Sequence, residues 1–213
     1  MRNIVLFGPP GCGKGTQAAI LANNLGYIKV STGDLLRDIA EEDSDLGIKI
    51  HSVLSSGLLV SDEEVNQLVE HFYSRNKNAT GLIFDGYPRN VSQVKALELI
   101  LSKHKDVVSN VFYFDLSEDT LVKRITGRYA CNKCGTIYNS FFFNPKKIGE
   151  CDNCCSSSFN KRADDSKDTL LERLKVYKNS TAPLLEYYKD KLIKIDAEAL
   201  VDTVSESIMS YFK

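Results

Sequence analysis

The sequence predicts an α/β fold built on a five-stranded parallel sheet, with two further segments inserted into it. Short apolar runs alternate along the chain with longer segments of helical periodicity, which is the pattern of parallel strands joined by helices. Most of the short runs are rich in Ile, Val, Phe or Tyr, as is typical of strands buried on both faces. At 213 residues, the chain has room for one domain of roughly 150 residues and the inserts.

The elements follow in order from these patterns. The expected strands are residues 3–7, 27–30, 82–85, 110–115 and 192–195. The expected helices between them, each with apolar residues three or four apart, are residues 14–24, 62–76, 91–105 and 118–128. A longer helix is expected over 168–191, bent at Pro183 because proline lacks an N–H and collides with the preceding turn. A final helix is expected over 200–212.

Two segments break the alternation of strands and helices. Residues 31–60 lie between the second and third strands and are expected to form two or three short helices. Residues 129–161 are rich in Cys, Asn, Ser and Phe and have weak helical character. We therefore expect both to be inserts, on a core made of residues 1–30, 61–128 and 162–213.

Charge and hydropathy exclude several classes of protein. Lys and Arg together number 27 and Asp and Glu 28, which argues against a domain that binds nucleic acid through bulk positive charge. No segment approaches the ~18–20 apolar residues that span a bilayer. The apolar run at residues 4–7 is shorter than the ~7–15 apolar residues of a secretory signal. We expect a cytoplasmic protein without nucleic acid or membrane partners.

A glycine-rich loop, GPPGCGKGTQ, follows the first expected strand at residues 8–17. The spacing Gly8-x4-Gly13-Lys14 is that of a P-loop, whose glycines let backbone N–H groups turn inward around phosphates. The following helix directs its N-terminal donors the same way, and Lys14 adds a positive charge. The strict pattern has Ser or Thr directly after the lysine. Here Gly15 intervenes and the hydroxyl lies on Thr16, so direct metal ligation by Thr16 stays open.

Five of the six cysteines lie close together in the second insert. The spacing Cys131-x2-Cys134-x16-Cys151-x2-Cys154 is in the range of a four-thiolate zinc site. Clustered cysteines in a reducing cytoplasm more often bind metal than form disulfides, although two disulfides or free thiols remain the alternative. Four thiolates leave no open coordination position, so we expect a structural zinc. Cys155 is a second candidate for the last ligand, but Cys154 keeps the two-residue spacing.

Four further motifs accompany the loop. They are STGDLLR at residues 31–37, GLLV at 57–60, DGYPR at 85–89 with Gln93, and the arginines Arg124, Arg128, Arg162 and Arg173 around the cysteine insert, with Asp164 and Asp165 beside them. From about residue 3 to residue 196, this combination resembles the nucleoside monophosphate kinases, and among them the adenylate kinases with a long lid. The resemblance implies a P-loop NTPase core, an AMP-binding insert at 31–60, a zinc-binding lid at 129–161, and the reaction MgATP + AMP ⇌ 2 ADP. It implies ATP, AMP and ADP as partners and Mg²⁺ and Zn²⁺ as cofactors.

The resemblance also implies sets of site residues. The catalytic set is Lys14, Arg89, Arg124, Arg128, Arg162 and Arg173. The ATP-binding set is Gly11, Cys12, Gly13, Lys14, Gly15, Thr16, Arg124, Arg128, Ile137 and Tyr138. The AMP-binding set is Thr32, Arg37, Leu58, Leu59, Val60, Gly86, Tyr87, Pro88, Arg89, Gln93, Arg162 and Arg173. Asp85 is expected to help hold Mg²⁺ through water, and Asp34 either belongs to this site or caps the next helix. Tyr129 and Asn139 depart from the family pattern, in which Arg and His are common.

The expected reaction explains why arginine is concentrated in these motifs. The nucleophile is already a phosphate oxygen, so the site must supply positioning and positive charge instead of a general base. The planar guanidinium matches phosphate oxygens better than a lysine does. Of 8 Arg, against 19 Lys, six fall in the motifs. A relative that uses GTP as donor, or UMP or CMP as acceptor, and a regulatory protein without catalysis stay open as alternatives, although Thr32 favours AMP. We expect a monomer.

Overall fold

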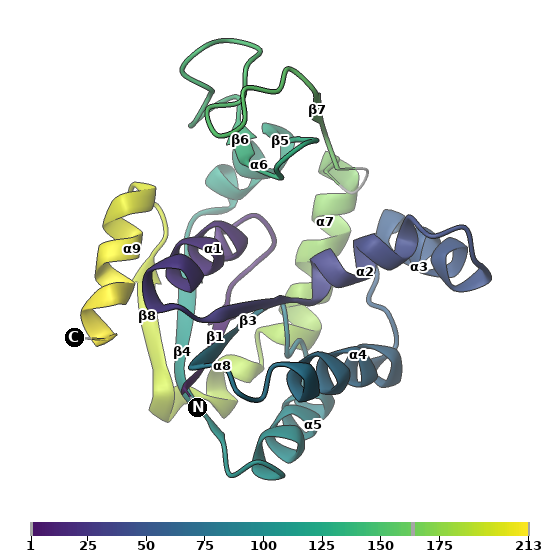
Figure 1. Cartoon of the computed structure of the whole chain (residues 1–213), viewed down its shortest axis with the longest axis vertical. Helices are drawn as coiled ribbons and strands as arrows, with labels where there is room; N and C mark the ends of the chain where they lie inside the picture. The colour runs from purple at the N-terminus through teal and green to yellow at the C-terminus, as the bar shows by residue number, and fades with distance from the viewer. Residues whose placement is uncertain (1, 163–164, 213) are drawn as a thin grey trace.

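The computed structural model describes residues 2–162 and 165–212. Over those ranges the chain forms a five-stranded parallel sheet, in the order β2-β3-β1-β4-β8, and a three-stranded antiparallel sheet, in the order β6-β5-β7 (Figure 1). The parallel strands are β1 (Arg2–Phe7), β2 (Ile28–Ser31), β3 (Gly81–Asp85), β4 (Val107–Asp115) and β8 (Leu192–Asp196). The predicted strands of the core are therefore confirmed, with ends shifted by at most three residues.

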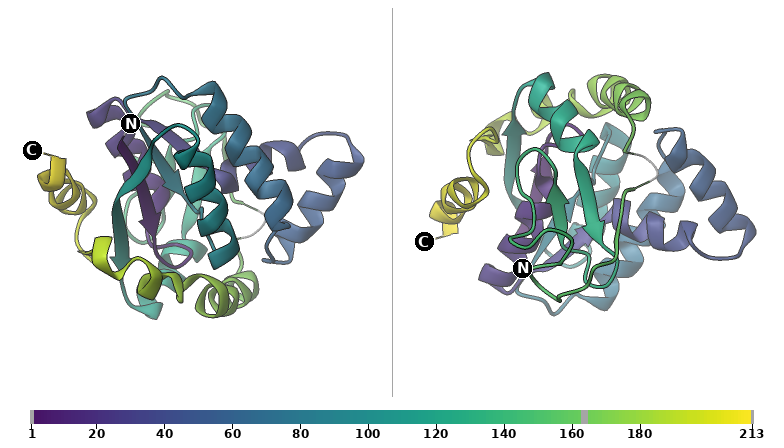
Figure 2. Two further views of the ribbon diagram at one scale, coloured as in Figure 1. Left: turned by 90° about the horizontal axis from the view of Figure 1, so that it is seen from below. Right: turned by 90° about the horizontal axis from the view of Figure 1, so that it is seen from above.

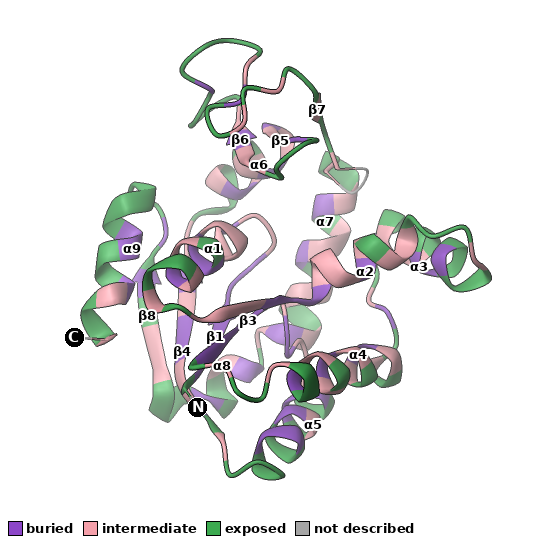
Figure 3. Ribbon diagram, in the orientation of Figure 1, coloured by how far each residue is buried: buried purple, intermediate pink, exposed green. Residues whose placement is uncertain are grey.

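Helices pack on both faces of the parallel sheet, as the two views in Figure 2 show. They are α1 (Lys14–Leu25), α4 (Asp62–Arg75), α5 (Val91–Ser102), α6 (Glu118–Thr126), α7 (Lys167–Val176), α8 (Leu184–Tyr187) and α9 (Val201–Met209). Ile4 and Leu6 of β1 belong to the cluster with α1 and α9, whereas Val5 and Phe7 belong to the cluster with α4 and α5. This alternation buries β1 on both faces, and in Figure 3 the central strands β1 and β3 are coloured as buried over most of their length. The edge strand β8 is mostly intermediate or exposed. Within the described ranges, no helix combines the length and apolar character needed to cross a membrane.

The order of the strands determines where a ligand can bind. From β1 the chain passes through α1 to β2 on one side, and after β3 it returns to β4 on the other side of β1. In open parallel sheets, ligands bind at the carboxyl ends of the strands where the connections diverge in this way. The glycine-rich loop follows β1 at this edge. Asp85, the last residue of β3, is paired in register with Leu6 and Ser31.

The first insert is a helical arm made of α2 (Thr32–Ala40) and α3 (Asp45–Ser55), as the sequence predicts. It extends away from the end of β2 (Figure 1). The Ser31 Oγ accepts a hydrogen bond from the Asp34 N–H at 3.3 Å and so caps α2. The alternative in which Asp34 caps this helix is therefore wrong, and its carboxylate is left for other contacts.

The second insert carries the small antiparallel sheet, made of β5 (Arg128–Cys131), β6 (Ile137–Asn139) and β7 (Phe159–Asn160). The sequence predicts a helix over 118–128, but α6 ends two residues earlier and Arg128 begins β5. The end of the helix packs against this second insert, which we call the lid after its expected role. A Cβ on Gly127 would lie 2.5 Å from the Phe141 Cδ2, so only glycine allows the lid to pack this closely.

The long helix predicted over 168–191 is interrupted before Pro183. After α7, a π-helical turn spans Tyr177–Thr181, and α8 begins at Leu184. In a regular helix, the proline ring would collide with the carbonyl of Asn179, four residues earlier. The Ala182 N–H instead donates to the Tyr177 oxygen at 2.9 Å, which widens the turn. The predicted bend is present, but the irregularity begins one turn earlier than predicted.

Burial of Phe112 gives a test of the sheet packing. Its side chain is fully buried, and the rings of Tyr211 and Phe212 lie 5.7 and 6.0 Å from it. We expect Phe112→Ala to lower the free energy of unfolding by about 3–5 kcal/mol, because a cavity replaces the ring. Leu99 on α5 is 61% exposed, so Leu99→Ala should change it by only about 0.5 kcal/mol or less. Urea unfolding followed by circular dichroism measures both, and similarly small changes in the two variants would contradict this packing.

Candidate active site

The loop between β1 and α1 folds around the amino group of Lys14. Gly11 and Gly13 take left-handed φ values of 84° and 98° there. At Gly11, a Cβ would also lie 2.7 Å from the Ile125 Cγ1, so the loop needs glycine for both reasons. The Lys14 Nζ donates to the backbone oxygens of Gly8 at 2.7 Å and Pro9 at 2.9 Å. The loop itself therefore fixes the position of the Lys14 ammonium group through these hydrogen bonds.

Arg124 on α6 contacts this loop from the other side. Its Nη1 donates to the Cys12 oxygen at 3.0 Å and its Nη2 to the Ala197 oxygen at 2.7 Å. The guanidinium carbon also lies 5.9 Å from the centroid of the Phe142 ring in the lid. Burial lowers the pKa of Arg124, which nevertheless stays charged at neutral pH. Arg124 thus connects the loop, the end of β8 and the lid.

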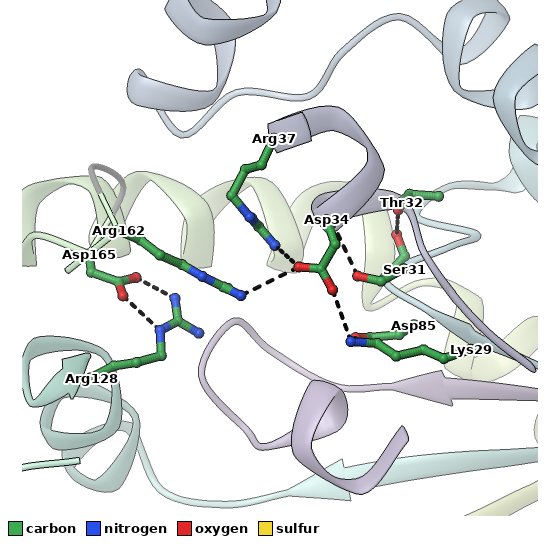
Figure 4. A network of polar contacts seen from close by, with 10 residues as sticks. Lys29, Ser31, Thr32, Asp34, Arg37, Asp85, Arg128, Arg162 and Asp165 are labelled. Carbon is green, nitrogen blue, oxygen red and sulfur yellow. Dashed lines mark hydrogen bonds and ion pairs between the residues drawn. The ribbon is translucent and has the colours of Figure 1, made fainter. Parts of the chain in front are cut away.

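The carboxylate of Asp34 forms ion pairs with basic side chains from three parts of the chain, as Figure 4 shows. Its Oδ2 lies 2.9 Å from the Lys29 Nζ, and its Oδ1 accepts from Arg37 of α2 and lies 3.4 Å from the Arg162 Nη2. Burial opposes ionisation of Asp34, but Lys29 and Arg37 outweigh it and hold the pKa of this carboxyl well below its usual range. An arginine of the first insert and the arginine that directly follows the second insert therefore meet at one carboxylate.

Arg128, at the start of β5, forms a bidentate pair with Asp165. The Nε donates to Oδ2 at 2.7 Å and the Nη2 donates to Oδ1 (Figure 4). The side chain of Asp165 is only 1% exposed. Asp164, the other acid of the predicted motif, lies outside the described residues. This pair ties the first lid strand to the segment that leads into α7.

A pocket lies beside α2, the start of α4 and the loop after β3. It is lined by Thr32, Leu36, Leu59, Val60, Val65, Gly86, Arg89 and Gln93. The Gly86 oxygen joins two of these residues, because it accepts from the Thr32 hydroxyl at 3.0 Å and the Arg89 Nε at 2.7 Å. Sequence reasoning missed Leu36 and Val65, since apolar residues at helical spacing look like ordinary core positions.

Other residues of the predicted AMP set lie around this pocket without being part of its lining. Leu58 is 49% exposed. Tyr87 is buried, and its hydroxyl donates to the Asn66 Oδ1 at 2.7 Å, so its ring supports the loop from the core side. Pro88 follows it through a cis peptide bond. Arg173 on α7 lies against the turn after α3, where a Cβ on Gly57 would be 3.2 Å from the Arg173 Cγ.

The position of Asp85 explains the unusual glycine after Lys14. Its Oδ2 lies 3.2 Å from the place that a Cβ on Gly15 would occupy, and 3.9 Å from the Lys29 Nζ. Any side chain on residue 15 would crowd this carboxylate. Gly15 therefore brings Asp85 next to the first turn of α1, where Thr16 is half-buried. The carboxylate lies at the edge where the sequence predicts magnesium.

Among the described residues, four thiols of the lid form a compact group in which all sulfurs lie within 4.8 Å of one another. They belong to Cys131, Cys134, Cys151 and Cys154. Sulfurs placed ~2.3 Å from a tetrahedral zinc are about 3.8 Å apart, so the group fits such an ion. Hydrogen bonds from Thr136 lower the pKa of Cys134 to about 5, which favours the thiolate that a metal needs. Cys155 is exposed outside this group, in agreement with the preference for Cys154.

An aromatic stack supports the thiol group. The Tyr138 ring is 1% exposed and lies between Tyr129 at 5.7 Å and Phe143 at 5.5 Å, both stacked. Its hydroxyl contacts the Cys151 Sγ at 3.4 Å. Tyr129, which replaces the arginine common in the family, therefore packs inside the lid. Asn139, the other departure, donates to the Arg124 oxygen at 2.8 Å and ties the lid to α6.

Comparison with known proteins shows the family of this chain. The family model for adenylate kinase matches residues 6–193. The chain is similar to the adenylate kinase of Thermosipho melanesiensis, with 41% identity over 99% of both chains. It is also similar to that of Hydrogenobaculum sp., with 40% identity over 97% of this chain and 98% of the relative. The adenylate kinase of Mycoplasma capricolum is 44% identical over 93% of this chain and 92% of its own length. This chain belongs to the adenylate kinase family.

Proposed function

We propose how the residues of this chain carry out the adenylate kinase reaction, the reversible transfer of the terminal phosphoryl group of MgATP to AMP to give two ADP. The observation that carries the proposal is the meeting of Arg37 and Arg162 at the carboxylate of Asp34, beside the phosphate loop. We divide the chain into a core of residues 1–30, 61–128 and 162–213, an AMP-binding insert at 31–60 and a lid at 129–161. The core and the AMP-binding insert supply arginines to one space, and Arg128 and Arg162 lie directly on either side of the lid.

On the donor side, the backbone N–H groups of residues 11–16 hold the phosphates of ATP. Lys14 exchanges its two loop carbonyls for phosphate oxygens, which bind the ammonium more strongly because they are charged. Arg124 and Arg128 join it from α6 and β5. The adenine lies against Ile137 and the backbone of Tyr138, since the ring of Tyr138 is buried in the lid.

On the acceptor side, the base of AMP occupies the pocket lined by Leu59, Val60 and Gln93. Arg37 and Arg89 hold its phosphate, and Arg162 and Arg173 reach the same phosphates from the end of the lid and from α7. Arg37 can release Asp34 as the phosphate arrives, because one anion replaces another. The acceptor oxygen needs no general base, since it is ionised in AMP.

The chemistry then consists of charge stabilisation with water kept out. The phosphate oxygen of AMP forms a bond to the terminal phosphorus of ATP as the bond to the leaving ADP breaks. The arginines stabilise the charge that spreads over the transferring group. Closure of the insert and the lid excludes water, so AMP receives the phosphoryl group. The carboxylate of Asp85 would hold through water the Mg²⁺ that accompanies ATP, and that ion would neutralise part of the phosphate charge.

We also propose that the lid thiols hold one zinc ion with a structural role. Four thiolate ligands close the coordination shell, so a zinc ion there would stabilise the lid without contacting substrate. The ion also requires reduced thiols, which fits a cytoplasmic protein. We propose a monomer, because residues of one chain line each nucleotide site.

Lys14→Ala tests the catalytic assignment. We expect kcat to fall by about 100- to 1,000-fold, because a charge directed at the transferring phosphate is lost. Lys95→Ala, at an exposed position on α5, is the matched control and should keep normal activity. The measurement is ADP formation from MgATP and AMP. The same assay with GTP, UMP or CMP gives the base preference. Activity of Lys14→Ala close to that of the control would disprove the assignment.

Metal content tests the lid proposal. We expect about one zinc per chain by atomic emission, its loss in Cys134→Ser, and a lower melting temperature with activity still measurable below it. Cys155→Ser removes a neighbouring thiol outside the group and should retain the metal. If Cys134→Ser kept its fold and melting temperature but lost all activity, the role of the metal would be catalytic and the proposal would be wrong.

A further inference from the structure

Asp62, the first residue of α4, contacts the amide that faces the acceptor pocket. The Asp62 Oδ1 accepts from the Gln93 Nε2 and from the Asn90 Nδ2, both at 2.8 Å. At the other end of the amide, the Gln93 Oε1 accepts the backbone N–H of Arg89 at 2.7 Å. Gln93 is 1% exposed and lines the pocket. Its amide is therefore held at both ends.

These partners determine which way the amide points. An ionised carboxylate only accepts hydrogen bonds, so the end of Gln93 that faces Asp62 must be the NH₂ group. A backbone N–H only donates, so the end that faces Arg89 must be the oxygen. Turning the amide over would place two acceptors together at Asp62 and two donors together at Arg89. The orientation follows from chemistry, because neither partner can exchange its role.

The amide keeps hydrogen-bonding capacity for a ligand. One N–H of Nε2 and one lone pair of Oε1 remain after the contacts with Asp62 and Arg89. The apolar residues Leu59, Val60 and Val65 line other parts of the pocket and offer no side-chain hydrogen bond. A base in this pocket must therefore present an acceptor and a donor to Gln93 in one fixed order.

Purines differ in the order of the hydrogen-bond donor and acceptor at positions 1 and 6 of the ring. Adenine has an acceptor at N1 and a donor at the 6-amino group, whereas hypoxanthine has a donor at N1 and an acceptor at O6. The base cannot turn over to exchange the two, because its ribose phosphate is held on the side of Arg37 and Arg89. A Gln93 amide free to rotate would fit both bases, and a fixed amide fits one of them.

We propose that Asp62 is a positioning residue that fixes the amide of Gln93, and that it thereby makes the acceptor site select 6-amino over 6-oxo purine monophosphates. This inference rests on the proposed placement of the AMP base against Gln93. Asp62 acts through Gln93 and does not contact the substrate. One turn further along α4, Asn66 accepts from the Tyr87 hydroxyl, which also lies 3.2 Å from the backbone oxygen of Gln93.

Asp62→Asn tests the proposal with little change of shape. The asparagine can donate or accept, so it supports either orientation of the amide. We expect KM for AMP to rise about 10-fold with kcat little changed, because one charge-assisted hydrogen bond no longer fixes the amide. The ratio of kcat/KM for AMP to kcat/KM for IMP should fall about 10-fold or more. The KM for MgATP should not change, since the donor site is untouched.

Glu63→Gln is the matched control, because it removes the same charge from the next residue, whose side chain is exposed and contacts Gln67. It should keep the kinetic constants of the unchanged chain. A second comparison uses Gln93→Leu, in which Asp62→Asn should have no further effect on KM for AMP or on the ratio. Melting temperatures of all variants show that they are folded under assay conditions.

Two results would overturn the proposal. One is an unchanged AMP to IMP ratio in folded Asp62→Asn. The other is an equal loss of kcat/KM for both nucleotides, which would make Asp62 a merely structural residue. Failure of the proposed function is distinguishable, because the unchanged chain would then not form ADP from MgATP and AMP, or Gln93→Leu would keep the normal KM for AMP.

Discussion

The repulsion between like charges is the constraint on which this structure depends. Several cationic side chains must be close together before any phosphate arrives, and two unit charges 4 Å apart near a protein surface repel by about 4 kcal/mol. The chain offsets this by giving the cations acceptors of its own. Lys14 and Arg124 bind backbone carbonyls, and Arg37 and Arg162 share the carboxylate of Asp34. In the proposed mechanism, phosphates replace these acceptors one by one, so the positive charges stay compensated at each stage.

The parallel sheet determines where this happens. Its carboxyl edge brings the phosphate loop after β1, the end of β2 before α2 and the end of β3 to neighbouring positions. The glycine at position 15 lets the carboxylate of Asp85 approach the loop. The first insert contributes Arg37 to this edge, and Arg162 reaches it from the segment that follows the second insert. The first insert also packs on the core through apolar side chains, among them Leu36 and Ile50.

Much of the fold could be predicted from local sequence. The core strands, the phosphate loop and the cysteine spacing each depend on residues close together in the chain, and they were placed correctly to within a few residues. What could not be predicted depends on partners far away in sequence. The early end of α6 follows from packing of Phe141 on Gly127, and the lid strands are too short to show a period. The break before Pro183 was located, but its widening into a π-helical turn was not.

In the site, too, the features set by local sequence could be predicted and those set by distant contacts could not. The sequence motifs indicate Thr32, Gly86 and Gln93, and these three residues line the same pocket. The orientation of the Gln93 amide depends on Asp62, which in sequence is only an acid in the first turn of a helix. Similarly, burial of the Tyr138 ring depends on its stacking with Phe143, and no local pattern reveals it.

The most direct test is a crystal structure of the chain with AMP, Mg²⁺ and a non-hydrolysable ATP analogue. We expect the Lys14 Nζ to have left the oxygens of Gly8 and Pro9, and Arg37 to have left Asp34. Both should lie within about 2.7–3.2 Å of phosphate oxygens. If Lys14 and Arg37 kept their present partners while both nucleotides were bound, exchange of internal acceptors for phosphates would not be how this site works.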